Sequence, residues 1–333
     1  MVESRITTIA GYGSAIAKAL EHCGVDSRRV FKAAGVPGPL ENDPLQRLDT
    51  ATLTRLYRIC VEVTGDAYFG LTVAKFIHAS NLHALGHSML ASSTLMDFCQ
   101  RVQRYFRLVS QTARIEVTEK GGDIHFAMSL LAEVCGESQD AWFGFVIRTM
   151  RLLYRDDFKP LRVEFPHPVP AAGDGPYLRY FGCSVLFGRP LGLLVLPGGD
   201  MRDPLQGACP ELAQFNDNIA ARYLAKLDRS DVVARVRAEI IERLPAGACD
   251  KETVAGALAM SPATLQLKLS QRGTGFSELL NDIRHELACS YLKQPAMPIT
   301  EIAFLLGFTE ISNFTRAFKR WAGMSPSAYR NQD

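Results

Sequence analysis

The chain has 333 residues, of which 47% are hydrophobic and 22% are charged, and its net charge is +2. This length favours two domains, and the composition is typical of a folded soluble protein, which excludes a disordered one. No apolar run reaches about 18 residues, so we expect no membrane span. Residues 1–5 lack the basic start and apolar core of a secretion signal, so we expect a cytoplasmic protein.

Its eight cysteines stand singly, and no Cys-x-x-Cys pair occurs. This pattern is typical of reduced, mostly buried thiols and does not indicate a zinc knuckle or a redox pair. His83 and His87 are four residues apart on a predicted helix, but the sequence offers no third metal ligand nearby. We therefore expect neither a metal nor another cofactor.

Helical periodicity dominates residues 1 to about 110. Within this part, residues 101–107 carry three arginines, a pattern that suits a phosphate site or, more simply, a solvated helix face. Residues 86–90, Gly-His-Ser-Met-Leu, share a glycine and a serine with a nucleophile elbow but lack its second glycine.

Alternation with period two then predicts a β-hairpin, because apolar residues recur at 115 and 117 and again at 124, 126, 128 and 130. Residues 120–123, Lys-Gly-Gly-Asp, are its predicted four-residue turn. Further elements are predicted in chain order: a helix at about 140–155, a strand at 161–165, a helix at 177–181, strands at 184–187 and 191–196, and a helix at 211–227. The first half of the chain is therefore predicted to be α+β, and the chain is wholly helical from residue 232. We assign residues 1–215 to a first domain, 216–231 to a linker and 232–333 to a second domain.

Two stretches of the second domain repeat one design, a short apolar helix, a tight turn and an amphipathic helix. In the second repeat, Phe314, Ala317, Phe318 and Trp321 have the spacing of one buried stripe. Ser312, Thr315, Arg316 and Lys319 have the same spacing on another face, and all are polar. Such a helix suits the DNA major groove, where arginine pairs bidentately with guanine. The charge of the chain favours contact with DNA only locally, because residues 310–330 carry four basic residues and one acidic residue.

The first repeat carries the same apolar skeleton 49 residues earlier, because Leu265 and Leu269 correspond to Phe314 and Phe318. Ser261 followed by Pro262 predicts the start of its second helix. Its front face consists of Ala263, Gln266, Leu267 and Ser270. A long helix at 276–293 separates the repeats and is suited to hold both reading helices on one side of DNA, about 34 Å apart. We place the two helix-turn-helix motifs at about 251–272 and 299–322.

The same region resembles the AraC/XylS transcription regulators. The resemblance rests on residues 276–288, on Ile302-Ala303 with Leu306-Gly307-Phe308, and on the closing stretch 314–330. The first domain, through Leu85-Gly86, residues 160–163 and residues 180–188, resembles the effector-sensing, arabinose-binding-like domain that one branch of that family carries.

The resemblance implies an α+β sensor and dimerisation domain followed by an all-α domain with two helix-turn-helix motifs. It implies that both reading faces approach successive major grooves of double-stranded DNA. Position 267 is commonly basic in the family but is leucine here, so we expect the first helix to read shape or thymine methyl groups, unless Leu267 packs inward. The residues expected at DNA are Ala263, Thr264, Gln266, Leu267, Lys268, Ser312, Asn313, Thr315, Arg316, Lys319 and Arg320.

The expected function is that of a sequence-specific DNA-binding regulator, a transcriptional activator whose first domain binds a small-molecule effector and shifts the population of domain or dimer arrangements. The expected partners are operator DNA, the effector, a second copy of the chain and, as a candidate, RNA polymerase. His125, Phe126 and Trp142 are the expected effector-binding residues, with core packing as the alternative for each. Two other classes stay open: an enzyme domain fused to a DNA-targeting module, and a constitutive dimeric DNA-binding protein.

Overall fold

A five-stranded sheet organises the first half of the chain in this computed structural model, which describes residues 6–36, 46–227, 232–247, 249–292 and 297–331. Its strands are β3 (Ala113–Lys120), β4 (Asp123–Leu130), β5 (Arg162–Glu164), β6 (Ser184–Leu186) and β7 (Gly192–Leu196). Their order is β3-β4-β7-β5-β6, and only the β5–β6 pair is parallel. The predicted hairpin is present, with Gly121 and Gly122 as the two central residues of the turn Lys120–Asp123. Both glycines have positive φ, as a tight hairpin turn requires.

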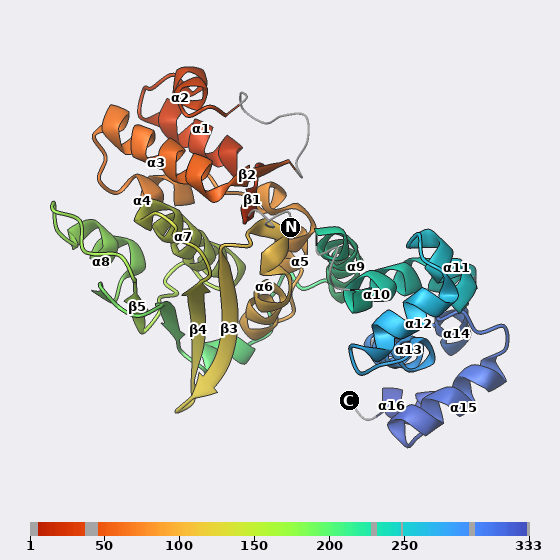
Figure 1. Ribbon diagram of the computed structural model, residues 1–333. Coiled ribbons are helices and arrows are strands. Elements are labelled where there is room, and N and C mark those ends of the chain that lie inside the picture. Colours follow the sequence, from red (N-terminus) through yellow and green to blue (C-terminus); the bar gives the residue numbers. More distant parts are fainter. Residues whose placement is uncertain (1–5, 37–45, 228–231, 248, 293–296, 332–333) are drawn as a thin grey trace. The chain divides into compact units, whose positions relative to one another are not determined.

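Helices pack around this sheet (Figure 1). The helices of this part are α1 (Tyr12–His22), α2 (Ser27–Ala33), α3 (Thr50–Thr64), α4 (Phe69–Ala74), α5 (His83–Leu90), α6 (Leu95–Val109), α7 (Gly136–Leu153) and α8 (Gly175–Phe181), with short 3-10 turns at Ala79–Leu82 and Asp200–Arg202. Phe143 of α7 packs against Phe126 of β4, with ring centroids 6.5 Å apart. Helix α7 is therefore the central helix over the sheet.

A two-stranded sheet, β1 (Thr7–Ile9) with β2 (Arg47–Asp49), was not predicted, because three residues are too few to show a period. Arg47 fastens it, donating to the Thr7 carbonyl at 2.9 Å and to the Leu108 carbonyl at the end of α6 at 2.8 Å. Residues 1–5, which entered the secretion-signal argument, lie outside the described residues.

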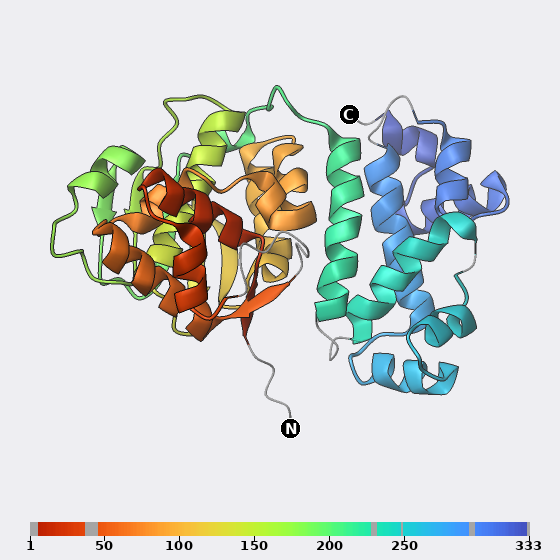
Figure 2. The same ribbon diagram turned by 90° about the horizontal axis from the view of Figure 1, so that it is seen from above.

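The second part of the chain is helical, with α10 (Val232–Arg243), α11 (Lys251–Ala257), α12 (Pro262–Ser270), α13 (Phe276–Leu292), α14 (Ile299–Leu305), α15 (Ile311–Ala322) and α16 (Pro326–Arg330), and a 3-10 turn at Leu244–Ala246. Helix α10 packs against α11 and α12, while α13 packs against α14, α15 and α16 (Figure 2). One continuous apolar core joins these helices. The predicted fold class, α+β followed by an all-α domain with two helix-turn-helix motifs, is confirmed.

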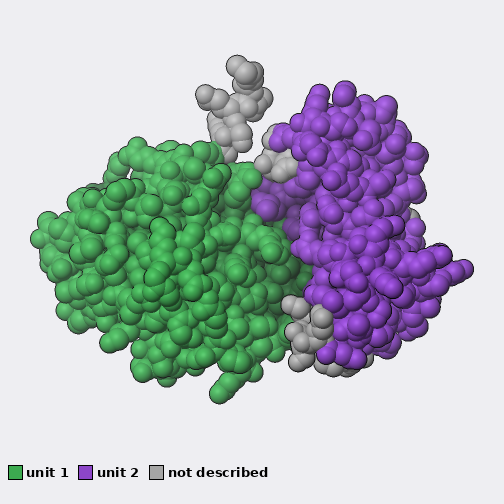
Figure 3. All heavy atoms as spheres, turned by 90° about the horizontal axis from the view of Figure 1, so that it is seen from below, with its two compact units in different colours: residues 1–220 green, residues 221–333 purple. Residues whose placement is uncertain are grey.

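The chain divides into two compact units, residues 1–220 and 221–333, coloured separately in Figure 3. Helix α9 (Pro210–Leu227) contributes to both. Residues 216–227, assigned from the sequence to a linker, therefore continue a helix, and residues 228–231 of that linker lie outside the described residues. Among the described residues, no helix is long and apolar enough to cross a membrane.

Candidate functional site

Helix α15 is held by a ladder of aromatic rings on its inner side. Phe314 and Phe318 are fully buried, and their ring centroids lie 5.8 Å apart. Phe308, in the turn before the helix, packs on Phe314 at 5.6 Å, and Trp321 lies 6.3 Å from Phe308. Because a helix has a fixed angular period, this ladder determines which residues face outward.

The outward face of α15 is polar and basic. Ser312, Arg316, Lys319 and Arg320 are exposed, and Asn313 and Thr315 are half-buried. Arg316 donates from Nη2 to the Asn313 side-chain oxygen at 2.6 Å. This contact holds one edge of the guanidinium on its own helix and leaves its other N–H groups to point outward. The six α15 residues predicted to contact DNA thus lie on one helix with a rigid apolar back.

The turn that sets α15 against α14 is built around Gly307. Its φ is +72°, and a Cβ placed there would lie 2.8 Å from the Leu244 carbonyl oxygen. Arg284 of α13 donates from Nε to the Leu306 carbonyl at 2.9 Å, and its guanidinium lies 4.5 Å from the centroid of the Phe308 ring. Burial lowers the pKa of Arg284, although a neighbouring thiol, Cys249, opposes the shift. The spacer helix therefore fixes the second turn directly.

Helix α12 begins as predicted, with the Ser261 side chain accepting a hydrogen bond from the Thr264 N–H at 3.1 Å. Leu265 and Leu269 are fully buried, as their alignment with the aromatic ladder of α15 predicts. Leu267 is 61% exposed, which excludes the alternative that it packs inward. Of the other front-face residues, Ala263 and Ser270 are exposed and Gln266 is half-buried. Thr264 and Lys268, also expected at DNA, are exposed beside this face.

The first turn differs from the second in its backbone. It spans residues 258–261, one residue fewer than the turn at 306–310. Its left-handed position is occupied by Ala259, with φ of 54°, where the second turn has glycine. An alanine in this region is strained by about 1–2 kcal/mol, so the first motif carries a local cost that the second avoids.

A small cavity of about 40 Å³, open on one side, lies in the first unit where β1, α1, the end of α6, the hairpin and α7 meet. Its wall is apolar at Phe106, Val109 and Met128, and the polar residues of the wall carry hydroxyl, amide or indole groups. None of its lining residues bears a carboxyl, amine, guanidinium or imidazole group. Tyr12 is its one lining residue with a titratable side chain, and burial raises the pKa of that phenol well above its usual range.

Two residues that line the cavity each have a buried polar atom without a hydrogen-bond partner, Gln139 Oε1 and Trp142 Nε1. Both residues are buried, at 4% and 5% exposure, and both lie on α7 one turn apart. Gln139 uses its other end, Nε2, to donate to the Val134 carbonyl at 3.1 Å. A buried acceptor or donor without a partner costs about 1–3 kcal/mol.

A short chain of hydroxyls forms another part of the wall. Ser110 Oγ lies 2.8 Å from Thr8 Oγ1 and 2.8 Å from Thr112 Oγ1, and all three residues are buried. These hydroxyls therefore satisfy one another.

The structure separates the three residues predicted to bind an effector. Trp142 lines the cavity, with its ring 4.9 Å from that of Phe106. Phe126 is fully buried against α7 deeper in the core, and His125 lies on the other face of β4; neither lines the cavity. Gln139 was missed because the predicted helix began at residue 140, although a polar residue one turn before Trp142 was the available signal.

The His167 imidazole and the Ser88 hydroxyl both make structural contacts. His167 Nε2 lies 3.0 Å from the Asp140 carboxyl, and its Nδ1 lies 2.9 Å from the Pro168 carbonyl, so both ring nitrogens have partners. Burial would lower the pKa of His167, but the hydrogen bond and charge of Asp140 raise it above its usual value. Ser88 is fully buried within α5. Among the described residues, no group of three or more His, Cys, Asp or Glu gathers around His83 and His87 or elsewhere in a geometry for a metal ion.

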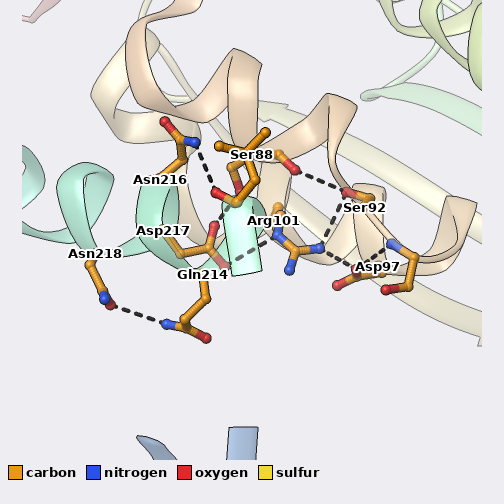
Figure 4. Close-up of polar contacts among 10 residues, drawn as sticks. Ser88, Ser92, Asp97, Arg101, Gln214, Asn216, Asp217 and Asn218 are labelled. Atoms are coloured by element: carbon orange, nitrogen blue, oxygen red, sulfur yellow. Dashed lines mark hydrogen bonds and ion pairs between the residues drawn. The ribbon is translucent and has the colours of Figure 1, made fainter. Parts of the chain in front are cut away.

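The arginine-rich stretch of α6 has two roles. Arg104 and Arg107 are exposed and line an open groove with β3, as a solvated face predicts. Arg101 differs, because its side chain is only 14% exposed and lies between Asp97 and Asp217, with Nε 3.2 Å from Asp217 Oδ2 (Figure 4). Its Nη1 donates to Ser92 Oγ at 3.2 Å, and Ser88 donates to Asp217. This polar cluster fastens the first half of α9 to α5 and α6.

Comparisons with known proteins agree with the two-unit architecture. Residues 24–205 match the family described as "Arabinose-binding domain of AraC transcription regulator, N-term", and residues 254–332 match a "Helix-turn-helix domain". The ornithine utilization regulator of Pseudomonas aeruginosa is 29% identical over 323 residues, covering 96% of this chain and 95% of the relative. The HTH-type transcriptional regulator VirS of Mycobacterium tuberculosis is 25% identical over 334 residues, covering 98% and 96%.

The crystal structure of the transcriptional regulator CdpR from Pseudomonas aeruginosa is similar to this chain in fold, with a TM-score of 0.54 at 19% identity. The likeness covers 96% of this chain and 97% of that structure.

Proposed function

The chain belongs to the AraC family of transcription regulators, and we propose that it reads its operator mainly through α15, with α12 as the weaker reader that sets the spacing. As a member of this family it is a DNA-binding regulator with an N-terminal ligand-binding domain. The observation that carries the proposal is the exposed face of α15, where Arg316 is held by Asn313 above a buried aromatic ladder. An arginine fixed in this way has less side-chain entropy to lose when it pairs with a guanine.

The proposed division of labour follows from the difference between the two front faces. Helix α15 offers Arg316, Lys319 and Arg320, whereas the outward position of α12 that the family commonly fills with a basic residue is the exposed Leu267. Leucine forms no hydrogen bond to a base, but it can pack against the methyl group of thymine. Lys268 beside it suits a phosphate contact, which orients a protein on DNA without reading sequence.

Further expectations belong to the same proposal. We propose that the chain has no catalytic activity of its own, because His167 has partners on both ring nitrogens and Ser88 is fully buried. We also propose that it acts as a homodimer in the cytoplasm, where the chromosome of a bacterium such as those of its relatives lies, and that it contacts RNA polymerase there.

Substitution of Arg316 tests the main proposal. Operator sites are selected from a pool of randomised duplexes with the full chain, and affinity is then measured for each base change in the selected site. We expect Arg316→Ala to cost about 1–3 kcal/mol and to remove the preference at one base pair only. Arg243→Ala is the matched control, because Arg243 ends α10, outside both reading helices, and pairs with Glu239 on that same helix at 3.2 Å.

Unchanged affinity and unchanged base preference in Arg316→Ala would refute the assignment of α15 as the main reader. A uniform loss of affinity at all sites would reduce Arg316 to a phosphate contact.

A further inference from the structure

We propose that a pocket beside Arg148 in the first unit binds a compact apolar molecule that carries a single carboxylate, such as cyclohexanecarboxylate. This inference rests on the proposed function, because it assigns a site and a ligand class to the N-terminal ligand-binding domain of a regulator. The pocket lies between α7 and the segment that runs from residue 77 into α5, and we call it the Arg148 pocket.

The Arg148 pocket has an apolar floor and opens to solvent. Its volume is about 210 Å³. Ile77, Met89 and Phe145 line it and are at most 2% exposed, whereas Leu152 lines it and is 76% exposed. The pocket therefore reaches from the core of the unit to its surface, as a ligand site requires.

The guanidinium of Arg148 lies at the wall of this pocket. Its Nη2 donates to the carbonyl oxygen of Ile77, and burial together with the charge of Arg148 lowers the pKa of the next residue, His78. Ile77 and His78 both line the pocket. Among the described residues that line it, Arg148 alone carries a permanent charge, and none carries a carboxylate. The charged end of Arg148, and not only its stem, thus belongs to the pocket.

Arg148 leaves most of its hydrogen-bonding capacity unused. A guanidinium has five N–H donors. Within the described part of the chain, the bond to Ile77 is the one hydrogen bond of the Arg148 side chain, and its Nε is buried without a partner. Arg151, which follows on the same helix, uses all three of its nitrogens, donating to three backbone carbonyls at 2.8, 2.9 and 3.2 Å. Backbone acceptors thus satisfy one of these two arginines and not the other.

The protein also gives Arg148 no counter-charge. Among the described residues, no carboxylate forms an ion pair with it. Burial lowers the pKa of its guanidinium, and the group that opposes this shift is the Tyr180 phenol. A charge removed from water is costly unless it is paired. A ligand carboxylate supplies the missing partner, because it can accept two parallel N–H bonds from a guanidinium.

The pocket suits one negative charge and not two. The His78 side chain accepts a hydrogen bond from the Asn81 N–H, and burial and the charge of Arg148 lower the pKa of its imidazole. His78 is therefore neutral near pH 7, which leaves Arg148 as the cation of the described lining. A second carboxylate on the ligand would have no counter-charge, and an ammonium group would be repelled by Arg148.

The volume and the apolar floor determine the rest of the ligand. An apolar cavity of about 150 Å³ accommodates a benzene ring. The volume of about 210 Å³ therefore accommodates a six-membered ring with a carboxylate attached. Packing of the ring against Met89 and Phe145 stabilises the complex by the apolar area removed from water. Acetate has the charge without this area, so we expect it to bind much more weakly.

Two other hollows of the first unit lack this combination. The cavity of about 40 Å³ is too small for the ring, and its described lining bears no guanidinium. The groove of about 660 Å³ between α6 and β3 contains Arg104 and Arg107, but Glu116 supplies a carboxylate in the same groove, and all three side chains are exposed to solvent. The Arg148 pocket joins an apolar floor to a half-buried cation without a carboxylate.

The test uses the full chain with Trp321→Phe, which leaves Trp142 as its single tryptophan. The ring centroid of Trp142 lies 5.7 Å from that of Phe145, a lining residue, so its fluorescence reports on the pocket. The probes are cyclohexanecarboxylate, the neutral isostere cyclohexanecarboxamide, and acetate. All are titrated near pH 7 at millimolar concentrations, because a ligand of about nine non-hydrogen atoms has a limited binding energy.

With cyclohexanecarboxylate we expect a saturable change in Trp142 fluorescence and a rise in melting temperature. The amide has the same shape but no charge, so we expect it to bind at least about tenfold more weakly, as we expect of acetate.

Two variants locate the contact. Arg148→Met keeps the apolar stem and removes the cation, so it is expected to weaken binding of the carboxylate about ten- to a hundredfold and to leave binding of the amide nearly unchanged. Leu152→Glu places a negative charge at the exposed mouth of the pocket, and is expected to weaken binding of the carboxylate alone. The matched controls are Arg155→Met and Leu161→Glu, because Arg155 and Leu161 are 50% and 49% exposed and neither lines the pocket.

Equal binding of the carboxylate and the amide, acetate binding as tight as that of cyclohexanecarboxylate, or no binding of the carboxylate in either readout would overturn the inference. So would carboxylate binding that both Arg148→Met and Leu152→Glu leave unchanged. Should Arg148→Met fail to fold, Leu152→Glu decides alone, because its position is exposed. Operator binding by the unsubstituted chain is measured in parallel. A chain that binds selected duplex but not the carboxylate keeps the proposed function, whereas a chain that selects no duplex loses the function itself.

Discussion

Replacing Arg101 by methionine removes the cation that lies between two carboxylates inside the first unit. The side chains of Arg101, Asp217 and Asp97 are 14%, 7% and 28% exposed. Methionine keeps most of the length and apolar contact of the arginine stem, so the change is chiefly one of charge and hydrogen bonding. Asp217, the more buried of the two carboxylates, is left with Ser88 as its hydrogen-bond donor in Figure 4.

Removing one partner of a buried ion pair costs about 3–5 kcal/mol, because the other charge stays buried without compensation. The cost here is expected to be lower, about 2–4 kcal/mol, for two reasons. Arg101 is partly reached by solvent, and burial already raises the pKa of Asp217, so this carboxyl can take up a proton and become neutral. Asp217→Asn in the Arg101→Met background should recover part of the loss, since no buried charge then remains at that position.

Urea unfolding followed by Trp142 fluorescence in the Trp321→Phe background reports on the first unit specifically. Arg155→Met is the matched control, because Arg155 is 50% exposed and pairs with Asp157 and Asp200 near the surface. Exposed pairs contribute about 0–1 kcal/mol. The reasoning is refuted if Arg101→Met costs no more than Arg155→Met, or if adding Asp217→Asn deepens the loss by its full single-mutant effect.

Three further predictions concern the turns, the buried histidine and the first reading helix. Ala259→Gly should stabilise the second unit by roughly 0.5–1 kcal/mol through relief of left-handed strain, whereas Gly307→Ala should cost at least about 2 kcal/mol; thermal unfolding measures both. The pKa of His167 is raised in the folded state, so the stabilisation from its pairing with Asp140 is complete below the unfolded value near 6.5 and is lost as pH rises through the folded value. The free energy of unfolding should therefore fall as pH rises above about 6.5, and less so in His167→Gln. Deoxyuridine in place of the contacted thymine should weaken binding by about 1 kcal/mol in the wild type and not in Leu267→Ala, in gel-shift titrations.

Periodic patterns predicted the elements that have enough length to show a period. The hairpin of β3 and β4, the helix α7 and both helix-turn-helix motifs follow from alternation or from the 3.6-residue repeat. The strands β1 and β2 could not be predicted in this way, because each has three residues and their pairing spans the chain from Thr7 to Asp49. The helical course of residues 216–227 was predicted and is present, while their assignment to a linker stays a prediction.

The two candidate sites differ in how far sequence could lead to them. The face of α15 follows from one helix alone, so residues 312, 316 and 319 were predicted from their spacing. The cavity depends on tertiary packing of elements between Thr8 and Trp142, and no local pattern reports such a meeting. Trp142 lines this cavity, whereas Phe126, which is also aromatic, is buried in the core, so residue type alone does not determine position.

The exposed leucine of α12 has a consequence for chemically modified operators. A contact made only with a methyl group in the major groove depends on carbon 5 of the pyrimidine, and 5-methylcytosine carries its methyl at that same position. If α12 and α15 read DNA as proposed, Leu267 would meet a methylated cytosine much as it would meet thymine, while Arg316 would read the guanine opposite an unmodified or modified cytosine alike. One half of the operator would then respond to the methylation state of the genome, and the other half would not.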